Sequence, residues 1–519
     1  MSASPGFINR TDEINAITSL LDTIDRHPLA DLANVYLPDC VVNLHGPPGI
    51  GKSALLQELL VQLRERCAAL LLDLRSRMPQ DRLPHEKLRF LQASLHQLEA
   101  LQPSPHGADL RARLADADDS LAGDLIDEGL AALLAELQLL SERRVIVLMI
   151  DSCEHASEAL FAWMERFVLL PLVHAPGDQP SRVLCVLASQ ILLRWRQHNV
   201  RRRVVAHLIG PLSRAATRAQ AGGDKLGDAL FRLTFGHALS NRVALAYLET
   251  QGAPPPNSVD WVASHEPELM REVVHRLREH AVTSMLAGEA TLLKRWEKWE
   301  LWQILEAIAI LREFDVNSLR VAIETYHESF VGRSQSALLI AIRDLLKTRL
   351  VEWNGLLRAY QVAPAMRQIF AHALELEQPQ IYARLRRAAI GYYEEQVRTV
   401  PGNRNLYLIE YMFQRLRHPE ATASDALHLE ADLVRTLGTY YANEQRTYLD
   451  QENLEALERA LQADKELQQA LVACHASGDL LVAAVQRFRQ PRSAPGGPPT
   501  GLQSKYEPPE SIPSGGSFG

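Results

Sequence analysis

The residues best suited to chemistry lie in one short stretch, residues 45–60, which reads HGPPGIGKSALLQELL. Glycines at 46, 49 and 51 allow a concave loop whose backbone amides point inward, because no Cβ blocks positive φ or a close ligand. A helix that begins at Lys52 and Ser53 adds unpaired amides and a positive dipole end. The spacing fits G-x-x-x-x-G-K-[ST] and therefore predicts a phosphate-binding loop.

In such a loop the amides surround the α- and β-phosphates, Lys52 reaches the β- and γ-phosphates, and the Ser53 hydroxyl ligates Mg²⁺. An aliphatic run at 40–44 precedes the loop, and a leucine-rich helical face at 55–63 follows it. This context favours nucleotide binding over a chance glycine-rich turn. We expect ATP or ADP with Mg²⁺ to bind through Gly46, Pro47, Pro48, Gly49, Ile50, Gly51, Lys52, Ser53 and Ala54.

A second group of candidates follows the aliphatic run Val145–Ile150. Open α/β sheets place their ligands at the carboxyl ends of the strands, where Asp151 would be a natural second anchor for Mg²⁺. Glu154 is close enough in sequence to orient or activate an attacking water. Asp151 could instead cap a helix, and Glu154 could be an ordinary exposed carboxylate. We predict Ser53 and Asp151 as metal ligands, and Lys52, Asp151 and Glu154 as catalytic residues.

Aliphatic runs that do not alternate with polar residues recur along residues 1–213. Such runs are typical of parallel strands that are buried on both faces and joined by helices. The pattern predicts strands near 40–44, 68–74, 145–150, 182–188 and 204–209, and helices near 12–25, 53–66 and 85–142. The predicted fold class is therefore an α/β P-loop nucleotide-binding domain with a parallel sheet over residues 1–213.

Strand signals nearly vanish after this point, so the remaining chain is predicted to be mainly helical. Glycine and proline clusters punctuate a helical lid domain over 214–290. Three helical patterns followed by an Asn-Gly hairpin signal predict a winged helix over 291–375. A C-terminal helical domain is expected over 376–487, and the Pro-, Gly- and Ser-rich residues 488–519 are expected to be disordered.

The composition is that of a globular protein with several domains, since the chain has 519 residues and is 47% hydrophobic. A net charge of −8 argues against a surface that contacts nucleic acid throughout, but a local basic patch stays open. The 5 cysteines are scattered, which is typical of reduced core cysteines. Signal-peptide and membrane-spanning patterns are missing, so we expect a cytoplasmic protein without membrane contact.

Several short motifs occur in the order of a known family. FINRTDE at 7–13 resembles the entry motif of STAND-class ATPases, relatives of AAA+ proteins that include NB-ARC domains. IDSCEH at 150–155 is similar to the Walker-B segment of bacterial NB-ARC regulators, and GPLS at 210–213 to the segment that follows one of their strands. FGHAL at 235–239 falls where they carry G-x-P-L. The resemblance extends from residue 5 to about 375.

This resemblance implies a switch in which ATP or ADP sits between the α/β core and the helical and winged-helix modules. Ile8, Arg10 and the Gly236 loop would then lie near the adenine. The γ-phosphate and Mg²⁺ would favour one arrangement of the modules by differential affinity, and self-association or binding of a separate effector protein would follow. Bacterial signalling and antiviral defence are the expected settings. The chain has little before residue 5, so we expect no N-terminal effector.

Some positions depart from the family pattern. Asn9 replaces the usual Gly, and Ala238 replaces the usual Pro. Gln190 stands where the family usually has an arginine that senses the γ-phosphate, and Arg194 or Arg196 could substitute for it. Ala363 stands where many members carry a histidine that touches the β-phosphate. We therefore expect nucleotide binding with slow or weak hydrolysis.

Two other functions fit the sequence. A DNA-acting AAA+ ATPase, such as an initiator or transposition adaptor, would use the winged helix and the basic residues at 194–203. The negative net charge favours a solvated face or an inter-subunit salt-bridge surface for that cluster, and the winged helix has few base-reading side chains, so nucleic acid is the less favoured partner. A scaffold that keeps its nucleotide without hydrolysing it is the third interpretation, which the departures at Gln190 and Ala363 favour.

Overall fold

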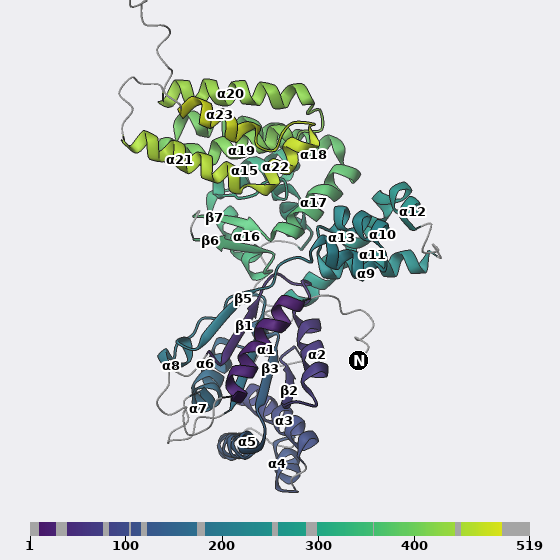
Figure 1. Cartoon of the computed structure of the whole chain (residues 1–519), viewed down its shortest axis with the longest axis vertical. Helices are drawn as coiled ribbons and strands as arrows, with labels where there is room; N and C mark the ends of the chain where they lie inside the picture. The colour runs from purple at the N-terminus through teal and green to yellow at the C-terminus, as the bar shows by residue number, and fades with distance from the viewer. Residues whose placement is uncertain are drawn as a thin grey trace, which may run out of the picture. The chain divides into compact units, whose positions relative to one another are not determined.

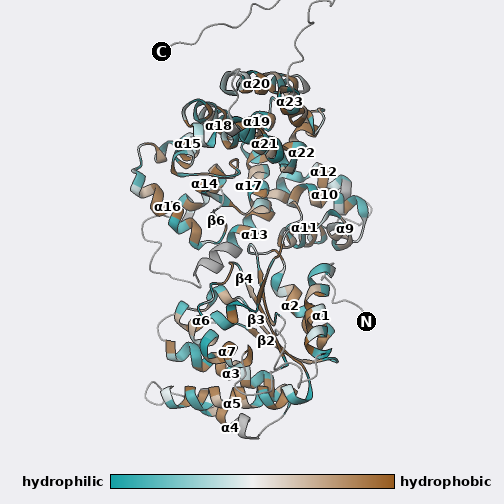
Figure 2. Ribbon diagram, turned by 60° about the vertical axis from the view of Figure 1, so that its left-hand side comes forward, coloured by the Kyte–Doolittle hydropathy of each residue, from teal (hydrophilic) through white to brown (hydrophobic). Residues whose placement is uncertain are grey.

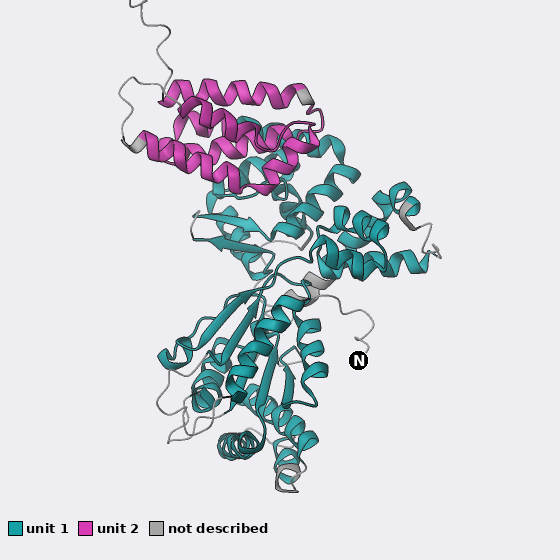
Figure 3. Cartoon of the chain, viewed as in Figure 1, with its two compact units in different colours: residues 1–392 teal, residues 393–519 magenta. Residues whose placement is uncertain are grey.

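A computed structural model of the chain describes residues 10–26, 39–75, 83–102, 105–115, 122–173, 182–251, 258–286, 298–355, 358–441 and 448–489. The chain divides into two compact units, residues 1–392 and 393–519 (Figure 3). The domain divisions predicted at 213, 290 and 375 fall inside the first unit and stay predictions. Ile8 and residues 490–519 of the predicted disordered tail lie outside the described residues.

A five-stranded sheet in the order β2-β3-β4-β1-β5 organises the first part of the chain (Figure 1). Every pairing in it is parallel, which confirms the predicted sheet. All residues of β3 and β4 are buried, as expected for strands covered on both faces. The strands are β1 (Val41–His45), β2 (Ala68–Asp73), β3 (Ile146–Asp151), β4 (Val183–Ser189) and β5 (Val204–Leu208).

Helices pack around this sheet and close its core. The strands are brown in Figure 2, and the helices beside them carry brown residues on one side and teal residues on another. In α2, for example, Leu55, Leu56 and Leu59 are fully buried against the sheet. The helices are α1 (Thr11–Arg26), α2 (Lys52–Leu63), α3 (Leu83–Leu101), α4 (Pro105–Ala115), α5 (Ala122–Arg143), α6 (Glu158–Met164), α7 (Leu170–Val173) and α8 (His198–Arg201).

A group of helices follows β5, as the sequence predicts for the lid region. These helices are α9 (Arg214–Ala221), α10 (Asp224–Thr234), α11 (Ala238–Thr250), α12 (Ser258–Ser264) and α13 (Glu266–Leu286). Polar side chains help to hold them together. Asn241 of α11 is fully buried and donates to Gln220 of α9 at 2.9 Å, while its amide oxygen contacts the Thr234 hydroxyl of α10. We name residues 214–286 the lid.

Three helices and a hairpin follow, which is the order of elements predicted for 291–375, and a fourth helix comes after the hairpin. They are α14 (Lys298–Ile308), α15 (Val316–Tyr326), α16 (Gln335–Lys347), β6 (Val351–Asn354), β7 (Ala359–Val362) and α17 (Pro364–Glu377). The strands pair antiparallel with Asn354 opposite Ala359, so the Asn-Gly signal lies at the start of a longer loop. We name residues 298–363 the hairpin module; its assignment as a winged helix stays a prediction.

The second unit is helical and has its own apolar core. Buried leucines at 408, 429, 433, 457 and 471 contribute to this core. The boundary between the two units falls within α18 (Pro379–Thr399). The helices that follow are α19 (Arg404–Leu416), α20 (Ala423–Tyr441), α21 (Tyr448–Ala463), α22 (Lys465–Ala473) and α23 (Leu480–Arg489). The predicted helical character of this region is confirmed.

All the cysteines are buried and free, in agreement with the prediction of reduced core cysteines. Among the helices that the structure describes, none combines the length and the apolar character needed to cross a bilayer.

A partly buried ion pair connects the lid to α17. His372 Nε2 lies 2.6 Å from Glu266 Oε1 at the start of α13, and His372 Nδ1 lies 3.6 Å from Glu375 Oε2. Burial alone would lower the pKa of His372, but hydrogen bonds to Glu375 and Glu266 outweigh it and raise the pKa. The raised pKa means that the folded protein favours the protonated imidazole.

We expect His372→Gln to lower the free energy of unfolding by about 1–2 kcal/mol at pH 6. The pair is fully formed below the ordinary histidine pKa of about 6.5 and is lost as pH rises through the raised pKa. The difference between parent and variant should therefore shrink between pH 6 and pH 9 in chemical denaturation. His275→Gln is the matched control, because His275 is exposed and, within the part of the chain that the structure describes, pairs only with Glu279 on its own helix.

Candidate functional site

The predicted phosphate loop, residues 46–53, connects the end of β1 to the start of α2. Gly49 and Gly51 have φ values of 74° and 104°, in the left-handed region that other residues rarely adopt. A Cβ on Gly49 would stand 2.8 Å from His237 Cε1 and 2.9 Å from Leu239 Cβ. Gly49 therefore satisfies a packing requirement as well as a backbone one.

Every carbonyl from Gly46 to Gly51 accepts a hydrogen bond. Lys52 Nζ donates to Gly46 O at 2.8 Å and to Pro47 O at 2.9 Å. The first turn of α2 supplies one more donor, because Leu55 N–H bonds to Gly51 O at 3.0 Å. These bonds come from within the loop and its own helix.

The remaining carbonyls are held by residues from elsewhere in the chain. His237 Nε2 lies 3.0 Å from Pro48 O, and Leu239 N–H donates to Gly49 O at 2.9 Å. Arg10 donates to Ile50 O and also to Gly210 O, each at 2.8 Å. The lid, the residue that precedes α1 and the segment after β5 therefore all contribute to the shape of the loop.

The carbonyl bonds also fix where the amides point. A trans peptide group is planar, so a carbonyl that is held outward turns the N–H of the next residue inward. For the amides of 49–53, no acceptor lies within hydrogen-bond distance among the described residues. A concave set of unpaired amides at a helix N-terminus is a site for a phosphate anion.

Two carboxylates lie beside this loop at the ends of neighbouring strands. Asp73 of β2 is in register with Asp151 of β3. Arg75 bridges them, with its guanidinium 2.9 Å from Asp73 and 3.4 Å from Asp151. The Ser53 hydroxyl faces Asp151 as well, and the structure thus brings the two predicted metal ligands together. Asp151 ends β3 and does not cap a helix, which excludes that alternative.

Burial shifts the pKa values of the charged groups in this site. The pKa of Asp151 is raised by burial and by its neighbours Asp73 and Glu154, while Ser53 and Arg75 lower it. The pKa of Lys52 falls to about 8 because its ammonium is buried, although Glu154 and Asp151 favour the charged form. A bound phosphate would add negative charge beside Lys52 and restore its positive charge.

Glu154 is positioned by a strained turn after β3. Ser152 is buried and has a φ of 60° and a ψ of 41°, a conformation that costs about 1–2 kcal/mol for a residue other than glycine. The turn leads into the short helix Cys153–His155, and Glu154 Oε2 then accepts from Gln190 N–H at 3.1 Å. Gln190 thus contributes its backbone to Glu154 at the place where an arginine was expected.

The arginines that could substitute for Gln190 point elsewhere or are exposed. Arg196 forms an ion pair with Glu158, and Arg194 is exposed. Ala363, which stands where a histidine was expected, is buried and donates its N–H to Leu350 O at 2.9 Å. Beside this Leu350 is Arg349, whose guanidinium is close enough to Glu154 for their charges to interact.

Sequence reasoning missed three residues at this site: Arg75, His237 and Arg349. A signal existed for two of them, since Arg75 follows the predicted strand directly and His237 lies in the motif at 235–239. No local pattern pointed to Arg349. The predicted adenine contacts stay predictions, and Ile8 lies outside the described residues. Arg10 binds a carbonyl of the phosphate loop. Gly236 packs so closely on Leu212 that a Cβ added at 236 would lie 2.1 Å from the carbonyl oxygen of Leu212.

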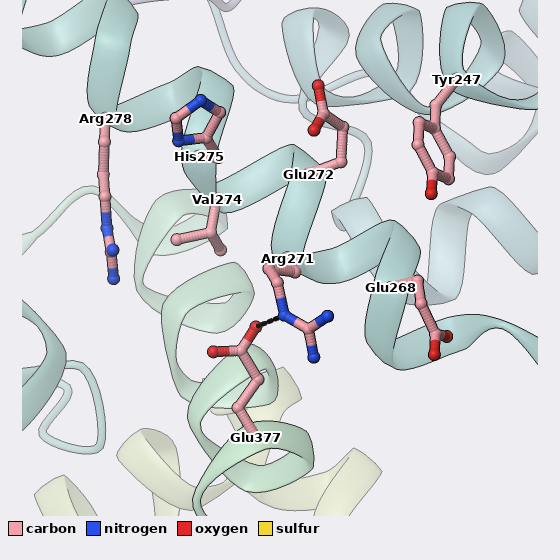
Figure 4. A pocket seen from close by; sticks show the side chains of 8 residues that line it. All are labelled: Tyr247, Glu268, Arg271, Glu272, Val274, His275, Arg278 and Glu377. Carbon is pink, nitrogen blue, oxygen red and sulfur yellow. Dashed lines mark ion pairs between the residues drawn. The ribbon is translucent and has the colours of Figure 1, made fainter. Parts of the chain in front are cut away.

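A separate cavity of about 350 Å³ lies among α11, α13 and α17 (Figure 4). Its lining mixes acidic and basic side chains, and Arg271 pairs with Glu377 at 3.5 Å across it. The residues that line it are Tyr247, Glu268, Arg271, Glu272, Val274, His275, Arg278 and Glu377. None of them belongs to the phosphate loop, so this cavity is distinct from the candidate site.

Comparison with protein families identifies the region that holds this site. Residues 7–171 match the family model described as AAA ATPase domain. Over these residues the chain is similar to P-loop ATPases of the AAA+ type. The matched segment contains the phosphate loop, Arg75, Asp151 and Glu154, and the narrower STAND assignment stays a prediction. A search of curated proteins gives no match.

Solved structures show a loose overall likeness. Cdc6p from Pyrobaculum aerophilum is 13% identical, with a TM-score of 0.32, over 73% of this chain and 97% of the other. The RuvB Holliday junction branch migration motor of Thermotoga maritima is 13% identical, with a TM-score of 0.30, over 69% and 92%. Drosophila ORC bound to DNA is 15% identical, with a TM-score of 0.26, over 71% and 98%. Similarity at this level is too low to carry functional conclusions.

Crowding at the phosphate loop gives a stability prediction. We expect Gly49→Ala to lower the free energy of unfolding by about 2–4 kcal/mol, because strain at positive φ adds to displacement of His237 and Leu239. Gly222→Ala is the matched control: Gly222 has a φ of 70°, but an added methyl group would meet nothing within 4 Å. It should lose only about 1 kcal/mol. Equal losses in chemical denaturation would contradict close packing of the lid on the loop.

Proposed function

We propose that this chain is an ATP-binding switch, in which the nucleotide at residues 46–53 sets the arrangement of the lid and the hairpin module. The observation that carries the proposal is the bonding of the phosphate loop. Its outward carbonyls are held partly by the lid, through His237 and Leu239, and its inward amides have the form of an anion site. A ligand that binds these amides is thereby linked to the position of the lid.

The donor set fits a magnesium nucleotide. Mg²⁺ is usually bound by one or two protein oxygens together with phosphate oxygens and water. Ser53 and Asp151 face each other beside the loop, and the Lys52 ammonium bonds to the loop carbonyls Gly46 O and Pro47 O. Ser53 and Asp151 would hold the metal, which would neutralise phosphate charge when bound. Glu154 would be placed to orient a water molecule.

The hairpin module supplies a second link to the nucleotide. Arg349 lies within electrostatic range of Glu154, and Glu352 of β6 lies within range of His45 at the end of β1. Arg349 is exposed and has no ion-pair partner among the described residues. We propose that its guanidinium contacts the terminal phosphate, a role that neither Gln190 nor Ala363 can fill. Nucleotide exchange or slow hydrolysis would then change how the module is held, and with it self-association or binding of an effector.

The first test of this proposal is nucleotide binding itself. Lys52→Ala should lower the affinity for MgADP and MgATP by about tenfold or more, because a buried cation that faces the phosphates is lost. Calorimetry on nucleotide-free protein measures the affinity. Lys225→Ala, at an exposed position of α10, should bind as the parent does. A parent chain that gives no heat with either nucleotide would overturn the proposed function.

The second test separates binding from switching. Arg349→Ala should keep most of its affinity for MgADP but lose several-fold in affinity for MgATP, because only ATP carries the phosphate that Arg349 would contact. It should also lose any difference in sedimentation between the MgADP and MgATP forms. Arg343→Ala, on the exposed side of α16, is the control. Equal discrimination between the two nucleotides in parent and Arg349→Ala would contradict the role of Arg349.

A DNA-acting AAA+ ATPase is a second candidate, favoured by the exposure of basic residues. Arg194, Arg196, Arg201 and Arg202 all lie at the surface, and Arg196 forms an ion pair with Glu158. Duplex DNA would bind such a cluster with strong salt dependence. The exposed side of α16 offers little for base recognition, since Arg343 and Lys347 both pair with Asp344.

If this second function is correct, duplex DNA should bind at low salt and lose affinity steeply as salt increases. Replacing Arg194, Arg201 and Arg202 by Ala should weaken binding by roughly tenfold or more and reduce the salt slope. Filter binding between about 50 mM and about 200 mM salt measures both quantities. Absence of binding by the parent at low salt would eliminate the DNA function while leaving the switch untouched.

A further inference from the structure

His237 occupies an unusual position between the lid and the phosphate loop. The residue is fully buried, and it is the N-cap of α11. Its Nδ1 accepts from Ser240 N–H at 3.4 Å and lies 2.8 Å from Ser240 Oγ. Its Nε2 lies 3.0 Å from Pro48 O. One imidazole therefore joins the first turn of a lid helix to the phosphate loop.

These contacts determine the tautomer. A backbone N–H can only donate, so Nδ1 must be the acceptor and carries no proton. Nε2 then bears the hydrogen and donates it to Pro48 O, which as a carbonyl oxygen can only accept. The neutral imidazole thus satisfies a helix cap and a loop carbonyl at the same time.

The peptide group that His237 holds is the one that matters for anion binding. Pro47 and Pro48 have no N–H, so the Gly49 amide is the first donor that the loop can offer after Gly46. Pro48 O and Gly49 N–H belong to the same planar peptide group. Because His237 draws the oxygen outward, the Gly49 hydrogen is directed inward.

Neighbouring contacts make this arrangement rigid. Leu239 N–H holds the next carbonyl, that of Gly49, at 2.9 Å. Gly236 accepts from Leu212 N–H at 2.8 Å, and a Cβ at 236 would collide with Leu212 O at 2.1 Å. The turn that carries His237 is therefore clamped between the segment after β5 and the phosphate loop, and it cannot shift without releasing the loop carbonyls.

We propose that His237 is a positioning residue that orients the Gly49 amide toward the nucleotide, and only while the lid is docked on the loop. The proposal rests on the proposed function and deepens it, because it names the contact through which phosphate binding and lid position are coupled. Displacement of the lid frees the Pro48–Gly49 peptide to rotate and weakens the anion site. Conversely, a bound phosphate favours the docked lid by the same differential affinity.

Two substitutions separate the two roles of the imidazole. A glutamine amide reaches as far as Nε2, so His237→Gln keeps a donor for Pro48 O but loses the acceptor at the Nδ1 position. An asparagine oxygen stands near the Nδ1 position, so His237→Asn keeps a favourable N-cap but loses the donor to Pro48. Calorimetry with MgADP on the nucleotide-free full chain compares both variants with the parent.

We expect His237→Asn to bind MgADP roughly tenfold more weakly, because the buried Pro48 carbonyl is left unsatisfied and its peptide is released. His237→Gln should bind within about threefold of the parent, although its lid helix loses a cap. Equal affinity of His237→Asn and parent would overturn the proposal. Equal weakening in both variants would overturn it too, because helix capping alone would then account for the effect.

Hydrogen exchange on the parent chain tests the coupling without any substitution, and it decides the matter if His237→Asn fails to fold. MgADP should slow amide exchange in residues 46–53 and also in residues 237–241, because the docked lid is favoured. Slower exchange in 46–53 alone would overturn the proposal. If the parent does not bind MgADP, the proposed function itself fails. If the parent binds MgADP and His237→Asn binds it equally well, only the role of His237 fails.

Discussion

The candidate site depends on one constraint: the planarity of the peptide group. Amides can converge on an anion only if the carbonyls of the same peptides are satisfied on the other side. In this chain the bonds come from Lys52 and Leu55 locally, and from Arg10, His237 and Leu239 at a distance. The loop is therefore not an independent motif, and its shape is a property of the α/β core and the lid together.

Charge is distributed around the loop in a manner that suits a ligand with several negative charges. Buried Lys52 interacts with the loop carbonyls and with the carboxylates Asp151 and Glu154. Its pKa is lowered because burial removes the water that would stabilise the charged ammonium. Arg75 approaches Asp151 from the end of β2, and Arg349 approaches Glu154 from the hairpin module. The cations near these carboxylates thus come from parts of the sequence other than positions 190 and 363.

The strands and the phosphate loop could be predicted from the sequence because their signals are local: unbroken aliphatic runs, and glycines at fixed spacing before Lys52. Asp151 could be predicted because it ends such a run. The roles of Arg75, His237 and Arg349 could not be predicted in this way, since each depends on an approach between distant segments. His237 and Pro48 are 189 positions apart, and a single histidine at a helix start gives no sign of a distant carbonyl.

The parallel order of the strands has a consequence for how the protein is made. β1 lies between β4 and β5, so Val41 pairs with Cys185 and with Val204, and both partners leave the ribosome long after it does. Contacts of such long sequence separation close late in folding, after the entropy of the intervening loop has been overcome. A nascent chain that ends before His237 still lacks the donors for Pro48 O and Gly49 O. The phosphate loop therefore acquires the full set of partners for its carbonyls only after the first lid helices have emerged.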